Sequence, residues 1–223
     1  MVQKPNGRSI AQAPRRSRRR DARRDEILRA AARMFRARGY ADTGMRDIAE
    51  AADLSPANLY HYFRGKDEIL FYCQDRALDR MLASVAEARR RERSAPARLR
   101  AVLDAHLRTM LDEVAGATAH LQVDALPAGL RDRIVRKRDR YERAVRRILT
   151  DGIRRGECTA ADPALAARAM LGALNWTVTW FDPAGPQSAA AVAGQIADLL
   201  VRAVAARPAA VRRLRLVRPT HAR

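Results

Sequence analysis

Apolar residues recur with helical spacing along almost the whole chain. The first stripe consists of Ile27, Leu28, Ala31, Met34 and Phe35. Similar spacing continues through residues 66–91, 96–115, 128–156, 161–181 and 187–206, with a shorter segment at 116–124. Apolar residues at i, i+3, i+4 and i+7 form one face of an amphipathic helix, whereas a strand alternates apolar and polar residues. Because no useful length of alternation occurs, the sequence predicts an all-α fold of about nine helices.

Turn signals divide the chain after the first helix into short elements. That helix is expected to end at Gly39, and a second one begins about five residues later. Ser55 is a good N-cap and Pro56 suits the first helical position, so a third helix begins at a fixed place. Asp53 lies in the turn between the second and third helices, where an acidic residue tolerates unusual backbone angles.

The third helix, in the segment DLSPANLYHYF, has an apolar and a polar face. At about 100° per residue, Leu59 and Phe63 point inward, with Tyr62 at the edge. Ala57 and His61 then point outward. A helix this short is not stable alone, so it must dock on the first two helices and present its outer face.

The outer face of this helix carries residue types that suit DNA. Ala57 allows close approach, and Asn58 can read a base edge. The side chains that can donate to phosphates are Tyr60, His61, Arg64 and Lys66. These features predict the recognition helix of a helix-turn-helix. An ordinary surface helix is the alternative, and it leaves polar aromatic side chains on a solvated face unexplained.

The formal net charge of +19 is concentrated at the two ends of the chain. Residues 1–24 carry nine basic side chains and one acid, and residues 207–223 carry six arginines and no acid. Blocks of like charge without an apolar period are typically disordered, and basic ones often contact nucleic acid. We therefore predict a disordered basic arm at residues 1–22 that contacts DNA, the alternative being a solvated arm without a role. For the basic tail at 207–223 both readings stay open.

Several classes of protein are disfavoured. No apolar run approaches the roughly 20 residues of a membrane helix, and the N-terminus lacks the apolar stretch of a signal peptide. Cys73 and Cys158 are far apart, so we expect reduced core thiols in a cytoplasmic protein. The histidines are His61, His106, His120 and His221, which are not grouped at metal-ligand spacing. Since catalytic and phosphate-binding motifs are also missing, we expect no metal site, no cofactor, no membrane association and no enzyme.

The segment GYADTGMRDIAEAADLSPANLYHYFRGKDEIL resembles the DNA-binding domain of the TetR family of bacterial transcriptional regulators. The resemblance covers about residues 24–70 and rests on Gly39, Tyr40, Thr43, Arg46, Asp47, Ile48, Ala49, Ala52, Ser55, Leu59, Tyr60, Tyr62, Phe63, Lys66 and Leu70. Asp53 stands where the family usually has the turn glycine, which predicts slight strain. Gly44 stands where a second hydroxyl residue is common, which predicts the loss of one phosphate contact.

The resemblance implies DNA contacts for individual residues. Thr43 and Arg46 are expected near the backbone of the duplex. The residues expected at the major groove are Pro56, Ala57, Asn58 and Tyr60, preceded by Ser55 at the start of the helix. The residues expected to hold phosphates are Tyr60, His61, Tyr62 and Lys66. The run Arg15–Arg24 is expected to enter an adjacent minor groove.

The resemblance also implies a variable helical second domain that dimerises and binds a small effector. The last two predicted helices, ADPALAARAMLGALNWTVTW and SAAAVAGQIADLLVRAV, are rich in alanine, and small residues let helices approach closely. Their apolar positions run nearly all round, so more than one side must be covered. We expect a homodimer with a two-fold four-helix interface. A wholly intramolecular core is the alternative.

Two polar residues interrupt the apolar stripes of the middle helices. His106 is either a satisfied core residue or a ligand contact. Arg138 is costly to bury unpaired, so it needs a partner. That partner is an acidic ligand or one of the carboxylates of Asp104, Asp112 and Asp124. The predicted effector site consists of His106, Met110, Arg138, Tyr141 and Trp176.

The segments NWTVTWFDPAGP and RDRYERAVRRILTDGIRRGE resemble a branch of the TetR family in which several members sense acyl-CoA thioesters. Trp176 and Trp180 are four residues apart and share a helix face, which suits either ligand contact or dimer packing. Asp182 stands where that branch often carries a basic residue, which argues against a contact to CoA phosphates there. The expected effector is a small apolar or acyl-type molecule, such as a fatty acid or an acyl-CoA.

These features predict four segments along the chain. They are the arm at 1–22, a three-helix helix-turn-helix DNA-binding domain at 23–68, a larger helical effector-binding and dimerisation domain at 69–206, and the tail at 207–223. The predicted function is a ligand-responsive repressor that is released from a palindromic DNA operator. A constitutive DNA-binding protein without an effector is the alternative. An enzyme or carrier built on the helical domain is a third reading, for which the chain supplies no catalytic cluster.

Overall fold

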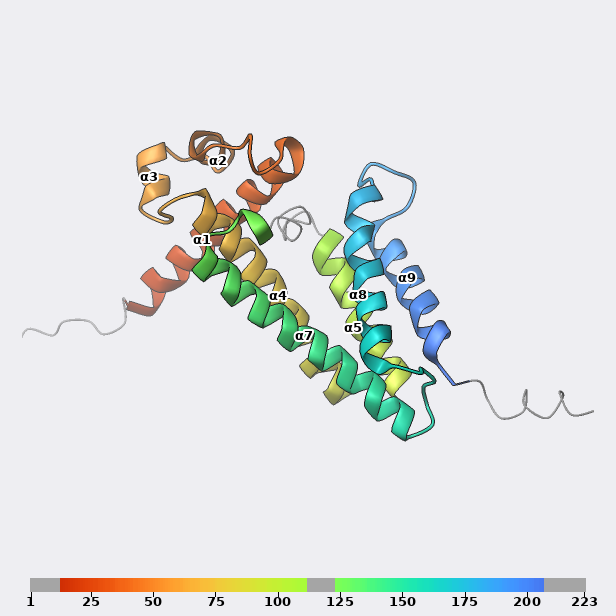
Figure 1. The fold of residues 1–223 in the computed structure, drawn as a ribbon. Helices are drawn as coiled ribbons and strands as arrows, with labels where there is room; N and C mark the ends of the chain where they lie inside the picture. The colour runs from red at the N-terminus through yellow and green to blue at the C-terminus, as the bar shows by residue number, and fades with distance from the viewer. Residues whose placement is uncertain (1–12, 112–122, 207–223) are drawn as a thin grey trace, which may run out of the picture. The chain divides into compact units, whose positions relative to one another are not determined.

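The computed structural model describes residues 13–111 and 123–206, with side chains described from residue 18 onward. This part of the chain contains eight α-helices and one 3-10 turn, and no strand (Figure 1). The elements are α1 (Ala13–Arg38), α2 (Met45–Ala51), α3 (Pro56–Tyr60), α4 (Lys66–Arg91), α5 (Ala95–Leu111), η1 (Val123–Ala125), α7 (Ala128–Arg154), α8 (Pro163–Trp180) and α9 (Ala189–Val204). The predicted all-α fold is confirmed. Of the short helix predicted at 116–124, residues 116–122 lie outside the described residues.

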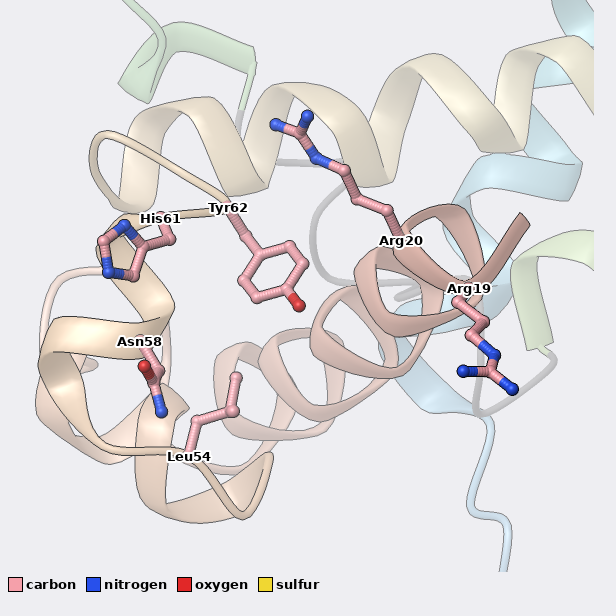
Figure 2. A pocket seen from close by; sticks show the side chains of 6 residues that line it. All are labelled: Arg19, Arg20, Leu54, Asn58, His61 and Tyr62. Atoms are coloured by element: carbon pink, nitrogen blue, oxygen red, sulfur yellow. The ribbon is translucent and has the colours of Figure 1, made fainter. Parts of the chain in front are cut away.

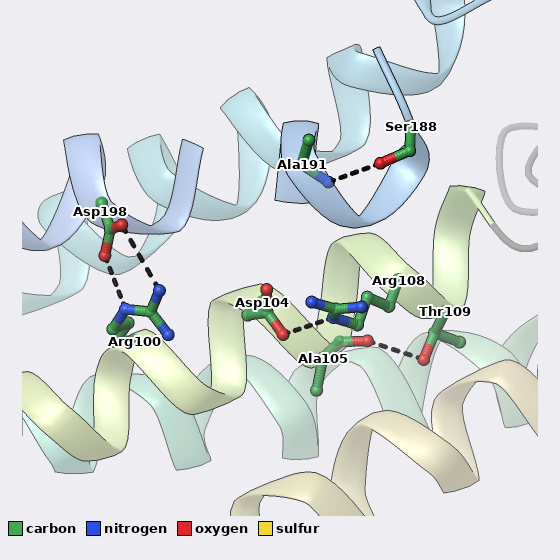
Figure 3. Close-up of polar contacts among 8 residues, drawn as sticks. All are labelled: Arg100, Asp104, Ala105, Arg108, Thr109, Ser188, Ala191 and Asp198. Carbon is green, nitrogen blue, oxygen red and sulfur yellow. Dashed lines mark hydrogen bonds and ion pairs between the residues drawn. The ribbon is translucent and has the colours of Figure 1, made fainter. Parts of the chain in front are cut away.

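The helix boundaries follow the predicted capping residues. Gly39, with a φ of 82°, ends α1. At the start of α3, the Oγ of Ser55 accepts a hydrogen bond from the backbone N–H of Asn58 at 3.2 Å. Ser188 caps α9 in the same way, by accepting from the N–H of Ala191 at 3.2 Å (Figure 3). Such caps satisfy N–H groups that the first helical turn leaves without a partner.

Helix α1 begins at Ala13, well before the predicted start of the folded chain. The prediction of a disordered arm over 1–22 is therefore wrong for residues 13–22, which are part of α1, while residues 1–12 lie outside the described residues. Arginine is a good helix former. The side chains of Arg18, Arg19 and Arg20 are exposed, so their charges stay hydrated while the helix continues. Repulsion between these like charges therefore does not prevent the segment from forming a helix.

The described residues fall into two compact units, and the first lies within Met1–Ala77 and Met110–Arg136. Its core is formed by buried apolar side chains that include Ile27, Phe35, Ile48, Leu59, Phe63 and Leu70. The unit takes in more of the chain than the predicted domain 23–68, because the first half of α4 packs into this core. The Sγ of Cys73 on α4, for example, lies 3.7 Å from the carbonyl oxygen of Leu28 on α1.

The second unit lies within Leu78–Thr109 and Lys137–Arg223. The segment after α7 ties its helices together. The side chain of Glu157 accepts a hydrogen bond from the N–H of Ala95 at 2.5 Å, which caps α5. The N–H of Thr159 donates to the carbonyl of Val204 at 2.7 Å, at the end of α9.

At the surface of the second unit, Arg100 on α5 pairs with Asp198 on α9. The Nε of Arg100 lies 2.6 Å from Oδ1 of Asp198 (Figure 3). Both side chains are well exposed. Exposed ion pairs contribute little to the free energy of folding, and both helices also bury apolar side chains, among them Leu99 and Val102 on α5 and Val192 and Ala193 on α9.

Candidate nucleic-acid interface

Helix α3 presents the side chains that the sequence predicts for its outer face. Leu59 is fully buried and anchors the helix in the core of the first unit. Ala57 and Asn58 are exposed, and Tyr60 keeps 55% of its surface accessible. A large exposed aromatic side chain next to an exposed amide offers both stacking and hydrogen bonding to a partner. The predicted orientation of this helix is confirmed.

The turn before α3 has the backbone geometry that a glycine normally adopts. Asp53 has a φ of 53°, in the left-handed region. The N–H of Leu54 donates to the carbonyl of Ala49 at 2.9 Å, and that of Asp53 to the carbonyl of Glu50 at 3.0 Å. This pair of bonds is the Schellman ending of a helix, here of α2. The positive φ of Asp53 agrees with the strain that the sequence predicts for an aspartate in place of the turn glycine.

Replacing Asp53 by glycine is expected to raise the free energy of unfolding by about 1 kcal/mol, because glycine adopts a positive φ without a Cβ clash. Urea unfolding of the variant and the parent protein measures the change. Replacing Gly65 by alanine serves as a control, since a Cβ there meets no atom within 4 Å and the φ is not in the left-handed region. A less stable Asp53→Gly protein would show that the aspartate compensates for its own strain.

A hollow lies between α3 and the N-terminal part of α1. Its lining residues are Arg19, Arg20, Leu54, Asn58, His61 and Tyr62. In Figure 2 the ring of Tyr62 lies between α1, which carries the two arginines, and α3 with Asn58. Two arginines, a histidine and a tyrosine thus line one hollow beside α3. This is a set of donors suited to phosphate oxygens.

A second hollow lies on the other side of Asn58. It is lined by Arg46, Glu50, Asp53, Leu54, Ser55, Pro56 and Asn58. Glu50 and Asp53 repel phosphates, so this hollow suits base edges or sugars better than the first one does. Arg46 is exposed at its margin, as predicted for a residue near the duplex. Asn58 is shared by both hollows, which places it centrally on the exposed face.

Two residues predicted to contact DNA make hydrogen bonds inside the protein. Thr43 is buried, and its Oγ1 donates to the carbonyl of Gly39 at 2.6 Å. The Nζ of Lys66 lies 3.0, 3.1 and 3.3 Å from the carbonyl oxygens of Tyr40, Ala41 and Thr43. An ammonium has three N–H donors, so these contacts use all of them.

Thr43 and Lys66 therefore have structural roles within the protein, and the DNA contacts predicted for them stay predictions. The physical reason is that the loop between α1 and α2 leaves carbonyl groups that need donors. The cation of Lys66 also lies 4.6 Å from the ring centroid of Tyr40. The sequence pattern does not show which carbonyl groups the loop exposes, so it did not indicate these internal hydrogen bonds.

Arg19 and Arg20 were part of the predicted basic run but were not singled out as site residues. The structure distinguishes them from the rest of the run because they line the first hollow. Their neighbours Arg23 and Arg24 face protein groups instead. Residues four apart share a helix face, so what separates the two pairs is their position along α1, one turn apart, which becomes readable only once α1 is extended through the run.

Among the predicted effector-site residues, the structure brings His106 and Tyr141 together. Both are buried, and Nδ1 of His106 lies 3.2 Å from the hydroxyl of Tyr141. The other ring nitrogen lies 3.3 Å from Oδ1 of Asn175, a residue the sequence did not indicate. Burial lowers the pKa of His106 to about 4, against an opposing effect of the Asn175 hydrogen bond. Burial also raises the pKa of the Tyr141 hydroxyl.

The other predicted effector residues differ in their burial. Trp176 is 68% exposed, whereas its neighbour Asn175 is partly buried and contacts His106. Arg138 is partly buried on α7. Met110 is buried and belongs to the first unit. The effector site stays a prediction, now with Asn175 as an added candidate.

The outer side of α8 and α9 is apolar in the isolated chain. We use the term α8–α9 face for its exposed large side chains, which are Leu165, Trp176, Trp180 and Leu199. Two tryptophans and two leucines at this exposure are unusual for a surface that stays in water. This face is where the sequence predicts dimer contact.

Among the residues that the structure describes, no helix is long and apolar enough to cross a bilayer. In the same part of the chain, no three His, Cys, Asp or Glu residues are grouped so that they could hold a metal ion.

Two family models match the chain. A model of bacterial regulatory proteins of the tetR family matches residues 27–73. A model of the Tetracyclin repressor-like C-terminal domain matches residues 92–204. The first range contains the whole candidate nucleic-acid interface apart from Arg19 and Arg20, and the second contains the α8–α9 face.

Known proteins similar to this chain include regulators of transcription. FasR of Mycolicibacterium smegmatis, an HTH-type transcriptional activator, is 38% identical over 86 residues, which are 39% of this chain and 39% of FasR. The solved TetR-family regulator PfmR of Thermus thermophilus is 36% identical, with a TM-score of 0.72 over 79% of this chain and 97% of that one. AibR, solved with isovaleryl coenzyme A and operator DNA, is 26% identical, with a TM-score of 0.66 over 80% and 96%. The match to FasR thus spans about two fifths of that protein.

Proposed function

Since the chain belongs to the TetR family of bacterial transcriptional regulators, we propose that it is a homodimeric repressor released from a palindromic operator by a small effector. The observation that carries the DNA-binding part is the exposed face of α3, with Asn58 between two hollows and Arg19 and Arg20 beside it. The protein acts in the cytoplasm, where its operator is. FasR is named an activator, so a reporter gene under the bound promoter is the test of the sign of regulation.

Asn58 is the proposed base-reading residue, and the arginines are proposed to hold the backbone. An amide can both donate and accept hydrogen bonds in the plane of a base edge, and the pattern of donors and acceptors there differs from base to base. Phosphates are the same at every position, so contacts to them carry no sequence information. Guanidinium groups bind phosphate oxygens and add affinity without sequence preference. The two hollows on either side of Asn58 allow both kinds of contact by one short helix.

Replacing Asn58 by alanine is expected to reduce discrimination between the operator and an operator with one changed base pair by about 1–2 kcal/mol. Competition binding with the two duplexes measures it. The matched control is Arg46→Gln, which should weaken both duplexes about equally. Equal weakening of both duplexes by Asn58→Ala would assign Asn58 to the backbone instead.

Replacing both Arg19 and Arg20 by glutamine is expected to flatten the salt dependence of DNA binding. Each lost phosphate contact lowers the slope of log affinity against log salt by about 0.9, and the dimer loses two contacts per protomer, so the slope should fall by about 3.6. Arg147→Gln is the control, because it removes an exposed charge from α7 in the second unit. If the control flattens the slope as much, the effect comes from net charge and not from the first hollow.

The homodimer is proposed to form through the α8–α9 face. Pairing two copies removes four large apolar side chains per chain from water, and burial of such side chains drives association. An isologous arrangement also supplies the two-fold symmetry that a palindromic operator requires. Sedimentation of Trp176→Glu and the parent protein tests this, since a buried carboxylate should convert the dimer to monomer.

The effector is proposed to be an acyl-CoA or a fatty acid. Support comes from the likeness to AibR, which was solved with isovaleryl coenzyme A, and from the tryptophan-rich end of α8. The buried His106 and Tyr141 and the partly buried Asn175 supply polar groups in an otherwise apolar region of the second unit. A ligand can release DNA only if it prefers a conformation in which the recognition helices no longer match successive grooves.

The effector proposal is tested by release of operator DNA. Acyl-CoAs of increasing chain length are added to the complex of the protein with its selected duplex, and free coenzyme A serves as the control. Release by one range of acyl chains, without release by coenzyme A, is the expected result. Retention of the duplex under all of them would support the alternative, a constitutive DNA-binding protein.

A further inference from the structure

Arg23 on α1 contacts the turn that precedes the recognition helix. Its Nη2 donates to the carbonyls of Ala52 and Asp53, at 3.1 Å each. Its Nη1 donates to Glu26 at 2.5 Å, which fixes the guanidinium from the other side. The two carbonyls belong to the C-cap of α2 and to the residue with positive φ. One side chain therefore bridges the strained point of the helix-turn-helix.

Arg24, the next residue of α1, contacts the segment that follows the recognition helix. Its guanidinium carbon lies 4.8 Å from the ring centroid of Phe63 and 4.6 Å from that of Tyr72. Phe63 is the third residue after the end of α3, and Tyr72 lies on α4. A planar cation against two aromatic rings is a favourable contact that a lysine reproduces less well.

We propose that Arg23 and Arg24 are positioning residues that hold the recognition helix at its two ends. Arg23 fixes the turn before α3, and Arg24 fixes the segment after it. Neither residue touches DNA in this account. The proposal deepens the proposed function, because it names the contacts that determine the angle at which Asn58 meets the groove.

The need for such contacts follows from the size of α3. Its five residues, Pro56–Tyr60, form little more than one turn, and a helix this short is not stable by itself. Leu59 is its single fully buried side chain. One anchor allows a short helix to rock about it, whereas contacts at both ends do not. The turn before α3 also carries the positive φ of Asp53, which a glycine would adopt without help.

The competing reading is that these two arginines bind phosphates, like Arg19 and Arg20. The two readings differ in salt dependence. A phosphate contact releases counterions, so its loss flattens the dependence of affinity on salt. A positioning residue changes affinity and discrimination while the number of neutralised phosphates stays the same. Loss of global stability is a third possible effect. It lowers the fraction of folded protein, but the folded protein keeps its salt slope and its discrimination between duplexes.

The experiment compares Arg23→Gln and Arg24→Lys with the parent protein on the selected operator and on a random duplex, at several salt concentrations. Unfolding curves of each variant give the folded fraction. Both variants should lose discrimination between the two duplexes, by about tenfold for Arg23→Gln, with the salt slope unchanged. For Arg23→Gln, a slope lower by about two, which is one lost contact in each protomer of the dimer, with equal loss on both duplexes, would overturn the proposal in favour of phosphate contact. Unchanged discrimination would overturn it as well.

A second substitution separates positioning from all direct contacts. Adding Asp53→Gly to Arg23→Gln relieves the strain that the arginine offsets, so it should restore most of the lost discrimination. A glycine in the turn restores no phosphate contact. Failure of this rescue would contradict the assigned role of Arg23. If the parent protein itself shows no preference for any duplex, the proposed function fails, and that outcome is distinct from failure of the positioning role.

Discussion

Replacing Gly152 by alanine is expected to lower the free energy of unfolding by about 3 kcal/mol, at the upper end of what overpacking costs. A Cβ at this position would lie 2.6 Å from the Cβ of Ala95 and 2.6 Å from the Sγ of Cys158. Neither atom is the far end of a flexible side chain. The N–H groups of Glu157 and Cys158 also bond the carbonyl of Gly152, at 2.8 and 3.2 Å, so the backbone cannot easily withdraw.

The matched control is Gly129→Ala in the same helix. A Cβ at Gly129 meets nothing within 4 Å, and the residue is exposed. Alanine is the better helix former, so this variant should be as stable as the parent protein or slightly more stable. Urea unfolding of the three proteins measures both effects. A loss below about 0.5 kcal/mol for Gly152→Ala would contradict the close contact of α5, α7 and the segment after α7.

Lowering the pH from 7 to 4 is expected to cost about 3 kcal/mol of stability through His106 alone. Burial lowers the pKa of this histidine from its ordinary 6.5 to about 4. The unfolded chain therefore binds a proton near pH 6.5 that the folded chain does not bind until about pH 4. Stability contributed by the neutral imidazole is present above pH 6.5 and is lost as the pH falls through this window.

Carboxylates also titrate between pH 7 and pH 4, so the effect of His106 is read as a difference between proteins. His106→Gln keeps a polar side chain near Tyr141 and Asn175 but has no group that titrates. Its stability should fall less than that of the parent protein over the same range, by about 3 kcal/mol at pH 4. Parallel curves of stability against pH for the two proteins would show that His106 binds its proton at the same pH in the folded and unfolded states.

Local rules predicted most of the fold. Ser55, Gly39 and the apolar stripe around Phe35 act through their own helix or turn, so capping and periodicity placed those elements correctly. The orientation of α3 was also predictable, because Leu59 is the apolar residue that a short helix must bury. The strain at Asp53 followed from a residue type that stands where the family usually has glycine.

Tertiary contacts decided what local rules could not. Thr43 and Lys66 carry donors that suit phosphates, yet backbone carbonyls of the α1–α2 loop use those donors. The arginines of residues 13–22 looked like a disordered arm by charge, whereas helix propensity and the anchored part of α1 extend the helix through them. His106 interrupts an apolar stripe, but its partners Tyr141 and Asn175 lie 35 and 69 residues away in the chain.

Selection of duplexes from a random pool by the full-length protein tests the central claim most directly. The claim is that two copies of the face around Asn58 read DNA together. The expected result is enrichment of an inverted repeat whose half-sites are centred about 34–36 Å apart, one turn of the duplex. Enrichment should be lost with Asn58→Ala at the base pairs that Asn58 reads. A pool that stays random, with binding that depends only on salt, would contradict sequence-specific recognition by this face.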